Sequence, residues 1–300
     1  MNKITIRIIG GLGNQLHCYA FGICLSKRLG CSVLYDCDSG YWDDPYGREY
    51  LLDEFPNIII QKASLPKSRV GILAYKVLRK LSIYFSSMLP LKFKTHVLEG
   101  RPSLYRPDIF FTDYLFNPYF MGYWASYRYL NESEDLIRYL LQPPLPDKNK
   151  TISDLIAKLN QKSSCFIHYR SYQEEKIFSR DLRSYYSKAI KHLLQKDPAV
   201  QFYILSDNID LARSQFKNID VPVNFIDLPD TNTNLTSLID FYLMYSCEHS
   251  IIGDSTFSWW AAWLDKKLYK VVVAPDGVSS LGGDWVDPSW HQVSNDENTD

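Results

Sequence analysis

The apolar positions in the first part of the chain fall into short runs that alternate with a longer helical pattern. Residues 4–9 (ITIRII) form an apolar run typical of a buried strand, and a helical pattern follows at residues 16–30. Residues 31–38 (CSVLYDCD) predict a second strand. Strand, helix and strand in this order predict a parallel sheet, because parallel neighbours need a long crossover connection.

The same alternation returns after a proline-rich stretch at residues 142–146. The chain therefore predicts two Rossmann-like α/β units, residues 1–147 and residues 148–300. In the second unit, strands are predicted at 163–171, 200–208, 224–230, 250–254 and 269–275, and helices at 182–197, 235–247 and 261–266.

Composition and charge exclude several functions. The net charge of −1 gives no reason to expect a nucleic-acid partner. The six cysteines form no CxxC pair and no zinc-ligand spacing, which favours buried thiols in a reducing compartment and no metal site. The apolar start is too short for a signal peptide, and no window approaches 18 uninterrupted apolar residues. We therefore expect a cytoplasmic protein.

A basic segment interrupts the first unit. Residues 55–98 hold eight Lys or Arg, all within 62–94, and no Asp or Glu, and residues 71–89 carry an apolar stripe at helical spacing. Such a helix can lie on the inner face of an anionic membrane, which would make the protein peripheral there. The alternative is a solvated helix that covers the first unit.

A hydroxyl-rich turn separates a predicted strand from a very apolar helix near residue 260. The turn holds Ser255, Thr256, Phe257 and Ser258 at the start of the helix. Free backbone N–H groups and the helix dipole favour an anion there, so the turn is a candidate diphosphate cradle. The alternative is that Asp254 or Ser255 only caps a core helix.

Polar residues end two other predicted strands of the second unit. His168 and Arg170 lie on one side of the strand at 163–171, and an Arg at the carboxyl end of a parallel strand can hold a phosphate. Its alternative is a surface pair with Glu174 or Glu175. Ser206 and Asp207 end the next strand, where Asp207 either binds a guanine or a ribose or caps the following helix.

The first predicted strand runs into the glycine-rich turn at residues 10–15 (GGLGNQ). Gly11 and Gly13 allow close approach of a ligand, and Asn14 adds a polar contact. Asp36 ends the next strand, as the ribose-binding acid of a nicotinamide-binding fold does, but the third glycine of that fingerprint is missing. Asp36 and Asp38 also form a DxD pair, which could hold a divalent metal or belong to an acceptor loop.

Six segments spread along the chain carry a family resemblance. The last of them reads CEHSIIGDSTFSWWAAWL and is the most specific. The matching segments are Gly10–Gln15 with the aromatic helix after it, Gly122–Ser126, His168–Gln173, Ser184–Ile190, Leu205–Asp207 and Cys247–Leu264. In this collinear set the sequence resembles the bacterial α-1,2-fucosyltransferases of glycosyltransferase family 11.

The resemblance implies a GT-B-like fold, in which two Rossmann-like units face each other across a cleft. It also implies GDP-L-fucose as donor substrate, inversion at the anomeric carbon, no cofactor and no metal. The expected acceptor is the 2-hydroxyl of galactose in an oligosaccharide or lipid-linked glycan. Arg170 would stabilise the leaving diphosphate. Trp124, Asp36 and Asp38 are expected on the acceptor side, and a general base is sought among Asp36, Asp38, Asp43 and Glu49.

The chain departs from the family pattern at three positions. Ser171 stands in place of a second arginine, and Gln173 stands in place of an acid. Asp254 replaces an asparagine at the phosphate-facing turn, where a carboxylate is unfavourable unless it turns away. These departures leave open a binding protein without catalysis, and the glycine turn with Asp36 leaves open a nicotinamide-dependent oxidoreductase.

Overall fold

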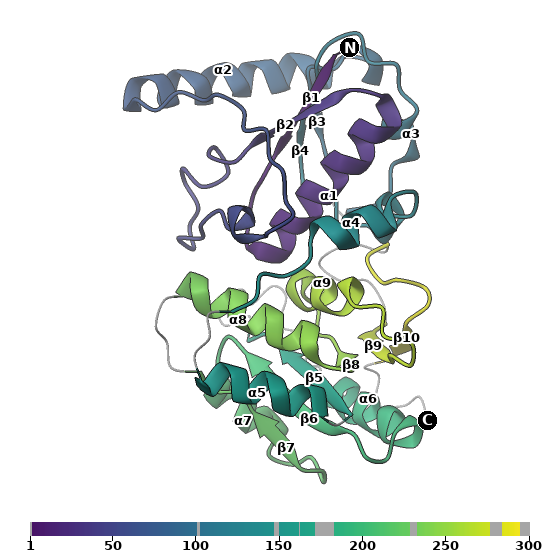
Figure 1. Ribbon diagram of the computed structural model, residues 1–300. Coiled ribbons are helices and arrows are strands. Elements are labelled where there is room, and N and C mark those ends of the chain that lie inside the picture. Colours follow the sequence, from purple (N-terminus) through teal and green to yellow (C-terminus); the bar gives the residue numbers. More distant parts are fainter. Residues whose placement is uncertain are drawn as a thin grey trace. The chain divides into compact units, whose positions relative to one another are not determined.

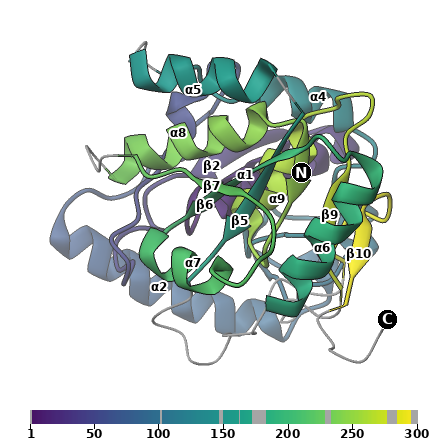
Figure 2. The ribbon, with the colours of Figure 1, turned by 90° about the horizontal axis from the view of Figure 1, so that it is seen from below.

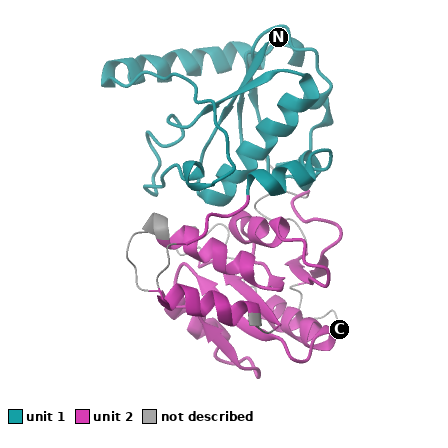
Figure 3. Ribbon diagram, viewed as in Figure 1, with its two compact units in different colours: residues 1–141 teal, residues 142–300 magenta. Residues whose placement is uncertain are grey.

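The chain divides into two compact units in a computed structural model, residues 1–141 and 142–300 (Figure 3). The structure describes residues 2–100, 103–146, 150–161, 163–171, 183–228, 233–276 and 284–294. Both units are α/β units built on a parallel sheet.

Unit 1 is built on a four-stranded parallel sheet with the order β2-β1-β4-β3 (Figure 1). Ile6 of the central strand pairs with Tyr35 on one side and with Phe120 on the other. The strands span β1 Lys3–Arg7, β2 Ser32–Asp36, β3 His96–Leu98 and β4 Tyr119–Met121. The predicted strand–helix–strand start is confirmed, whereas β3 and β4 lie where the sequence pattern predicts no strand.

Helix α1 (Leu12–Leu29) begins four residues earlier than predicted. Gly11 is its N-cap with extended backbone, so Gly13 and Asn14 belong to the first helical turn and only Gly10 and Gly11 form the loop. Gly30 ends the helix at φ 62°, the left-handed conformation that glycine adopts without strain.

The remaining helices of unit 1 are α2, α3 and α4. Helix α2 (Arg69–Ser87) confirms the helix predicted for the basic segment. The others are α3 (Pro107–Phe110) and α4 (Glu134–Leu140), with short 3-10 turns at Leu52–Glu54, Leu91–Phe93 and Tyr127–Tyr129. None of the helices in the described part of the chain has the length and apolar character needed to cross a bilayer.

Unit 2 is built on a six-stranded parallel sheet with the order β10-β9-β8-β5-β6-β7. Counted from β5 as the first strand, this is the order 3-2-1-4-5-6 of the classical dinucleotide-binding fold. The strands span β5 Ser164–Tyr169, β6 Gln201–Ser206, β7 Val223–Phe225, β8 His249–Ile251, β9 Val272–Pro275 and β10 His291–Val293. The prediction of a Rossmann-like second unit is therefore confirmed.

Helices cover both faces of the unit 2 sheet (Figure 2). One face carries α5 and α8, and α9 packs against α8. The other face carries α6 and α7, which share a core with Cys165 and Ile167 of β5 and with Phe202 and Ile204 of β6. The helices span α5 Lys150–Gln161, α6 Arg183–Lys196, α7 Ile209–Phe216, α8 Thr233–Ser246 and α9 Thr256–Leu264.

The Gly40 position tests how tightly unit 1 is packed. A Cβ at Gly40 would overlap the backbone carbonyl oxygen of Ile8, which a side-chain rotation cannot relieve. We expect Gly40→Ala to lower the free energy of unfolding by at least about 2 kcal/mol, the range found for overpacked sites. Gly100→Ala is the matched control, because nothing lies within 4 Å of its added Cβ. Equal urea midpoints for the two variants would contradict this packing.

Candidate active site

The order of the unit 2 strands reverses between β5 and β8, which are paired through Ile167 and Ile251. In open parallel sheets, ligands bind at the carboxyl ends of the strands where the order reverses. The segments that leave this point are Arg170 and Ser171 after β5, and the turn at 253–255 after β8. The fold therefore brings two of the predicted site segments to one place.

Gly253 keeps these two segments close beyond the end of the sheet. A Cβ at this residue would lie 2.9 Å from the carbonyl oxygen of His168 and 3.0 Å from the hydroxyl of Tyr186. Such distances are tighter than ordinary carbon contacts, so a larger residue would push the strands apart. Arg170 and Ser255 each follow this contact by two residues.

Two adjacent tyrosines of α6 hold the ends of the strands through hydrogen bonds to backbone carbonyls. Tyr186 donates a hydrogen bond to the carbonyl oxygen of His168 (2.8 Å), and Tyr185 donates to those of Ile252 (2.6 Å) and Val273 (2.9 Å). Burial raises the pKa of Tyr185 well above its ordinary value, so the hydroxyl stays protonated and remains a donor. These bonds tie α6 to backbone carbonyls at the ends of β5 and β8 and in β9.

Asp207 connects the end of β6 to the end of β5. Its carboxylate lies 3.2 Å from a guanidinium nitrogen of Arg170. It also accepts hydrogen bonds from the backbone N–H (2.9 Å) and the hydroxyl (3.2 Å) of Ser171. Ser171, a departure from the family pattern, thus helps to orient the carboxylate. Arg170 stays half exposed, and its other donors can meet an anion.

The structure decides one of the alternatives left open at these strand ends, the cap of the helix after β6. Helix α7 is capped by Asn208, whose side chain accepts from the N–H of Leu211 (2.9 Å), so the prediction that Asp207 caps this helix is wrong. Ser206 bonds within the same turn, to both the N–H and the carbonyl of Asn208. Gln173, Glu174 and Glu175 lie outside the described residues.

His168 is buried beside the site, and its imidazole ring is neutral. Its side chain packs 5.8 Å from the ring of Phe257, and only 4% of the residue is exposed. Burial lowers its pKa to about 4, and the charge of Arg170 acts in the same direction while Asp207 opposes it. Within the described residues, its Nδ1 has no hydrogen-bond partner.

Helix α9 starts with a serine cap, as one of the two alternatives predicts. Ser255 accepts a hydrogen bond from the N–H of Phe257 (3.3 Å), and Asp254 is not the cap. The predicted three-hydroxyl cradle needs correction. Ser258 is fully buried and donates to the carbonyl of Ser255 (3.3 Å), and Thr256 is nearly buried. The partly accessible residues of this terminus are Asp254, Ser255 and Phe257.

In unit 1, the glycine loop joins β1 to α1 with Gly10 in the left-handed region at φ 79°. Asn14 lies directly below this loop, since its side-chain nitrogen would be 2.7 Å from a Cβ on Gly10. Gln15 is fully buried and donates to the carbonyls of Gly10 (3.0 Å) and Glu49 (2.7 Å). It therefore fastens the segment at Glu49 beside the glycine loop.

The structure corrects the predictions made for Asp36. This residue is fully buried, and its carboxylate accepts hydrogen bonds from the N–H groups of Asp38 (3.1 Å) and Ser39 (2.8 Å) and from the hydroxyls of Ser39 and Tyr119. A carboxylate occupied by its own loop cannot also hold a ribose, an acceptor sugar or a metal. Asp38 remains exposed. Across the described residues, no group of three or more metal-ligating side chains is found.

Trp124 is a core residue rather than a surface ring for a sugar. It is 1% exposed and stacks on Phe21 at 4.2 Å. Its backbone has a φ of 56°, which is uncommon for a bulky residue, and its N–H donates to Glu99 (2.9 Å). The expected acceptor role of this side chain is replaced by a packing role.

Sequence reasoning missed the residues that shape the site without touching a ligand. Gly253 and Tyr186 act through close approach and a backbone hydrogen bond. Both lie in segments that carry the family resemblance, but residue type alone gives neither of them a role. Ser171 appeared only as a departure from a pattern. The pairing of Arg170 with Asp207 had a usable signal, because both follow strands that are neighbours in a Rossmann sheet.

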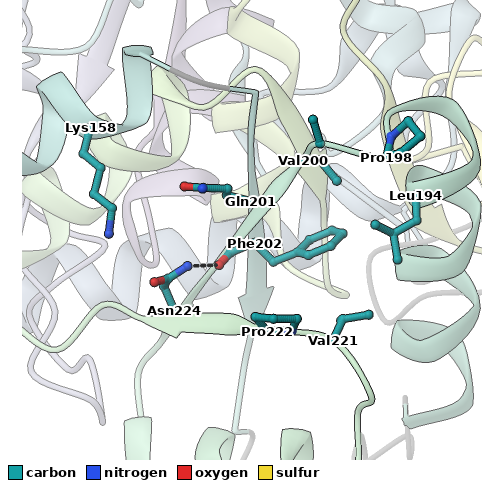
Figure 4. Close-up of a pocket in the computed structure, with 10 residues that line it drawn as sticks. Lys158, Leu194, Pro198, Val200, Gln201, Phe202, Val221, Pro222 and Asn224 are labelled. Atoms are coloured by element: carbon teal, nitrogen blue, oxygen red, sulfur yellow. Dashed lines mark hydrogen bonds between the residues drawn. The ribbon is translucent and has the colours of Figure 1, made fainter.

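A cavity of about 640 Å³ lies elsewhere in unit 2 (Figure 4). It is lined at the amino ends of β6 and β7 by residues such as Gln201, Phe202 and Asn224, and Asn224 donates to the carbonyl of Phe202 (3.1 Å). Ligands in this class of sheet bind at the carboxyl ends, so the cavity is not the active site.

The fold and this site define a GT-B-type protein, with two α/β units and an arginine where strand order reverses in the second. The sequence pattern of glycosyl transferase family 11 matches residues 111–277, more than half of the chain. The chain belongs to this family, and the family prediction is confirmed.

Two curated proteins and one solved structure are similar to this chain. The chain is 24% identical to an alpha-1,2-colitosyltransferase of Escherichia coli, covering 92% of each chain. It is 27% identical to the O-antigen biosynthesis glycosyltransferase WbnK of Escherichia coli, covering 89% of this chain and 91% of that protein. The crystal structure of fucosyltransferase NodZ from Bradyrhizobium matches 87% of this chain and 92% of its own, with a TM-score of 0.50 at 15% identity, which shows a shared fold.

Gly253 gives a test of the close approach at the site. We expect Gly253→Ala to reduce transferase turnover about tenfold or more, because small displacements of catalytic groups carry large rate penalties. Some stability is also expected to be lost, so turnover is measured well below the unfolding midpoint. Gly100→Ala serves again as the control. A Gly253→Ala enzyme with normal turnover would show that the spacing of β5 and β8 is not critical.

The buried His168 predicts a specific dependence of stability on pH. Its folded pKa of about 4 lies below the unfolded value of 6.5, so the unfolded chain binds more protons between these values. Its contribution to stability is therefore lost as the pH falls from 6.5 towards 4, with a limiting slope of about 1.4 kcal/mol per pH unit. His168→Gln removes this contribution, so its unfolding free energy should fall less steeply than that of the wild type. Parallel curves from urea unfolding would contradict the assignment.

Proposed function

We propose that this chain transfers L-fucose from GDP-L-fucose to the 2-hydroxyl of a galactose residue in a surface glycan, with inversion at the anomeric carbon. Membership of family 11 supports glycosyl transfer. The observation that carries the assignment of the donor site is the half-exposed Arg170, which directly follows β5 where the strand order reverses.

The chemistry required at this position is neutralisation of a leaving diphosphate. Negative charge grows on the β-phosphate as the glycosidic bond breaks, and fixed positive groups stabilise it. Arg170 supplies a permanent charge with several donors, and the start of α9 supplies backbone N–H groups and the positive end of a dipole. These two sources provide the stabilisation that a divalent cation would otherwise give, so we propose transfer without a metal.

Asp207 acts on Arg170 in this proposal. Its carboxylate fixes one guanidinium nitrogen, and Ser171 fixes the carboxylate. The arginine is thus oriented before the donor binds, which lowers the reorganisation needed in the transition state. Because His168 is neutral, it adds no second positive charge beside Arg170.

Deprotonation of the attacking hydroxyl needs a base on the acceptor side. Among the four carboxylates considered, Asp36 is buried and fully occupied, and Asp43 is paired with Lys76 at 2.6 Å. Asp38 and Glu49 are exposed, and Gln15 fastens the backbone of Glu49 beside the glycine loop. We propose Glu49 as the general base, to be tested with Glu49→Gln.

We propose that the acceptor is a galactose-containing oligosaccharide or a lipid-linked glycan. We also propose that the protein works in the cytoplasm, in peripheral contact with the membrane. The name of the O-antigen relative supports a surface polysaccharide. The name of the colitosyl relative favours a second candidate reaction, the transfer of colitose from its GDP derivative to the same position.

The decisive assay offers GDP-fucose, GDP-colitose, GDP-mannose and UDP-galactose to the purified protein with a panel of galactosides in excess chelator. Release of GDP from GDP-fucose alone, accelerated by acceptor, is the expected result. Release from GDP-colitose alone would establish the second candidate. Tight GDP binding without turnover on any donor would favour a binding protein, and loss of activity in chelator would contradict the metal-free mechanism.

The role of Arg170 is tested against an arginine of equal exposure in the same unit. Arg170→Ala should lower kcat by about 10² to 10³, as for removal of one group that stabilises the transition state. Arg213→Ala is the control, since Arg213 is 49% exposed and its neighbour Asp227 lies at 3.7 Å. An unchanged kcat in Arg170→Ala would exclude the proposed mechanism.

A further inference from the structure

Most of the apolar side chains of helix α2 face solvent. The partly buried side of the helix holds Ile72, Tyr75 and Ile83, together with the polar Lys76, Arg79, Ser82 and Ser86. An ordinary surface helix instead turns its main apolar stripe towards the core. The outward apolar residues are Val70 (80% exposed), Leu73 (65%), Val77 (51%), Leu78 (65%), Leu81 (50%), Tyr84 (59%) and Phe85 (62%), and Met88 (62%) follows directly.

Polar contacts hold the inner face of α2 against unit 1. Arg79 donates to the hydroxyl of Ser39 (2.8 Å), and Lys76 pairs with Asp43 (2.6 Å). Ser86 is buried and hydrogen-bonds both the carbonyl (2.9 Å) and the N–H (3.0 Å) of His96 in β3. Rotating the helix to bury its apolar stripe would break all of these contacts, so the exposed stripe is part of the fold.

The apolar residues form one continuous face. They recur at spacings of three and four residues, which places them on the same side of a helix. The helix has 19 residues, so the face extends for about 28 Å at a rise of about 1.5 Å per residue. An exposed apolar stripe of this length on a soluble protein marks an interaction surface.

The charges around this face identify the partner. Residues 55–98 contain no Asp or Glu. Lys76 and Arg79 are engaged on the inner side, whereas Lys67, Arg69 and Lys80 are exposed and have no ion pair within the described part of the chain. A second copy of the chain would bring like charges together, while an anionic bilayer provides both apolar tails and negative headgroups.

We propose that the outer face of α2 docks this enzyme on the surface of an anionic bilayer, with the helix in the plane of the headgroups. Its apolar side chains enter the boundary with the acyl chains, and Arg69 and Lys80 meet lipid phosphates. The helix lies on the membrane and does not span it. The proposal concerns where the enzyme works and stands independently of the donor and acceptor that it uses.

Vesicle flotation without any sugar substrate tests this surface. The wild type should float with vesicles of phosphatidylglycerol and phosphatidylethanolamine, remain unbound with phosphatidylcholine alone, and bind less as salt is raised. Leu73→Asp/Leu81→Asp should weaken binding about tenfold or more, because it places two charges in the buried interface. Leu268→Asp is the control, since Leu268 is 85% exposed in unit 2.

A second variant keeps the test valid if the aspartates impair folding. Arg69→Gln/Lys80→Gln leaves the apolar face intact and should reduce binding to anionic vesicles and its salt dependence. Unfolding midpoints and turnover on a soluble acceptor should match the wild type in both double variants, which separates docking from catalysis. Failure of the wild type to bind, binding that Leu73→Asp/Leu81→Asp leaves unchanged, or a wild-type dimer that this variant converts to monomers would each overturn the proposal.

Discussion

The contact between Gly253 and the carbonyl of His168 is the constraint on which the candidate site depends. This contact brings together the segments that follow β5 and β8, where the strand order reverses. Tyr186 of α6 donates a hydrogen bond to the same carbonyl of His168. Because both segments are held, Arg170 and the start of α9 have little freedom relative to each other. The diphosphate site that we propose is built from one side chain and one helix terminus, so it depends on this rigidity to keep the two groups aligned.

The fold of unit 2 could be predicted because its strands are apolar on both faces. Most residues of β5 and β6 are buried, and helices separate such strands along the chain. In unit 1, the first two strands, α1 and the helix of the basic segment could be predicted, whereas β3 and β4 could not. Strands β3 and β4 have three residues each, too few for a period to be recognised, and β4 takes its place beside β1 through pairing with distant residues.

Residue type predicted which side chains could carry chemistry, but not which are accessible. Arg170 and Asp207 were identified because strand ends point to one edge of the sheet, and the structure pairs them. Asp36, Trp124 and Ser258 were selected by the same kind of reasoning, yet all three are buried and bonded or stacked within their own units. Burial depends on the loops that fold back over a residue, and a single sequence does not determine it.

The orientation of helix α2 could not be predicted from the sequence either. Its periodicity predicted two faces, and the usual preference would bury the apolar one. Ser86 and Arg79 select the opposite orientation, because hydrogen bonds to His96 and Ser39 are available only on that side. In this orientation α2 makes hydrogen bonds to unit 1, but its exposed apolar residues are not buried within the unit. Contact with another apolar phase would bury these residues. The cations Arg69 and Lys80 have no ion pair among the described residues, so the anionic bilayer of our proposal matches both properties.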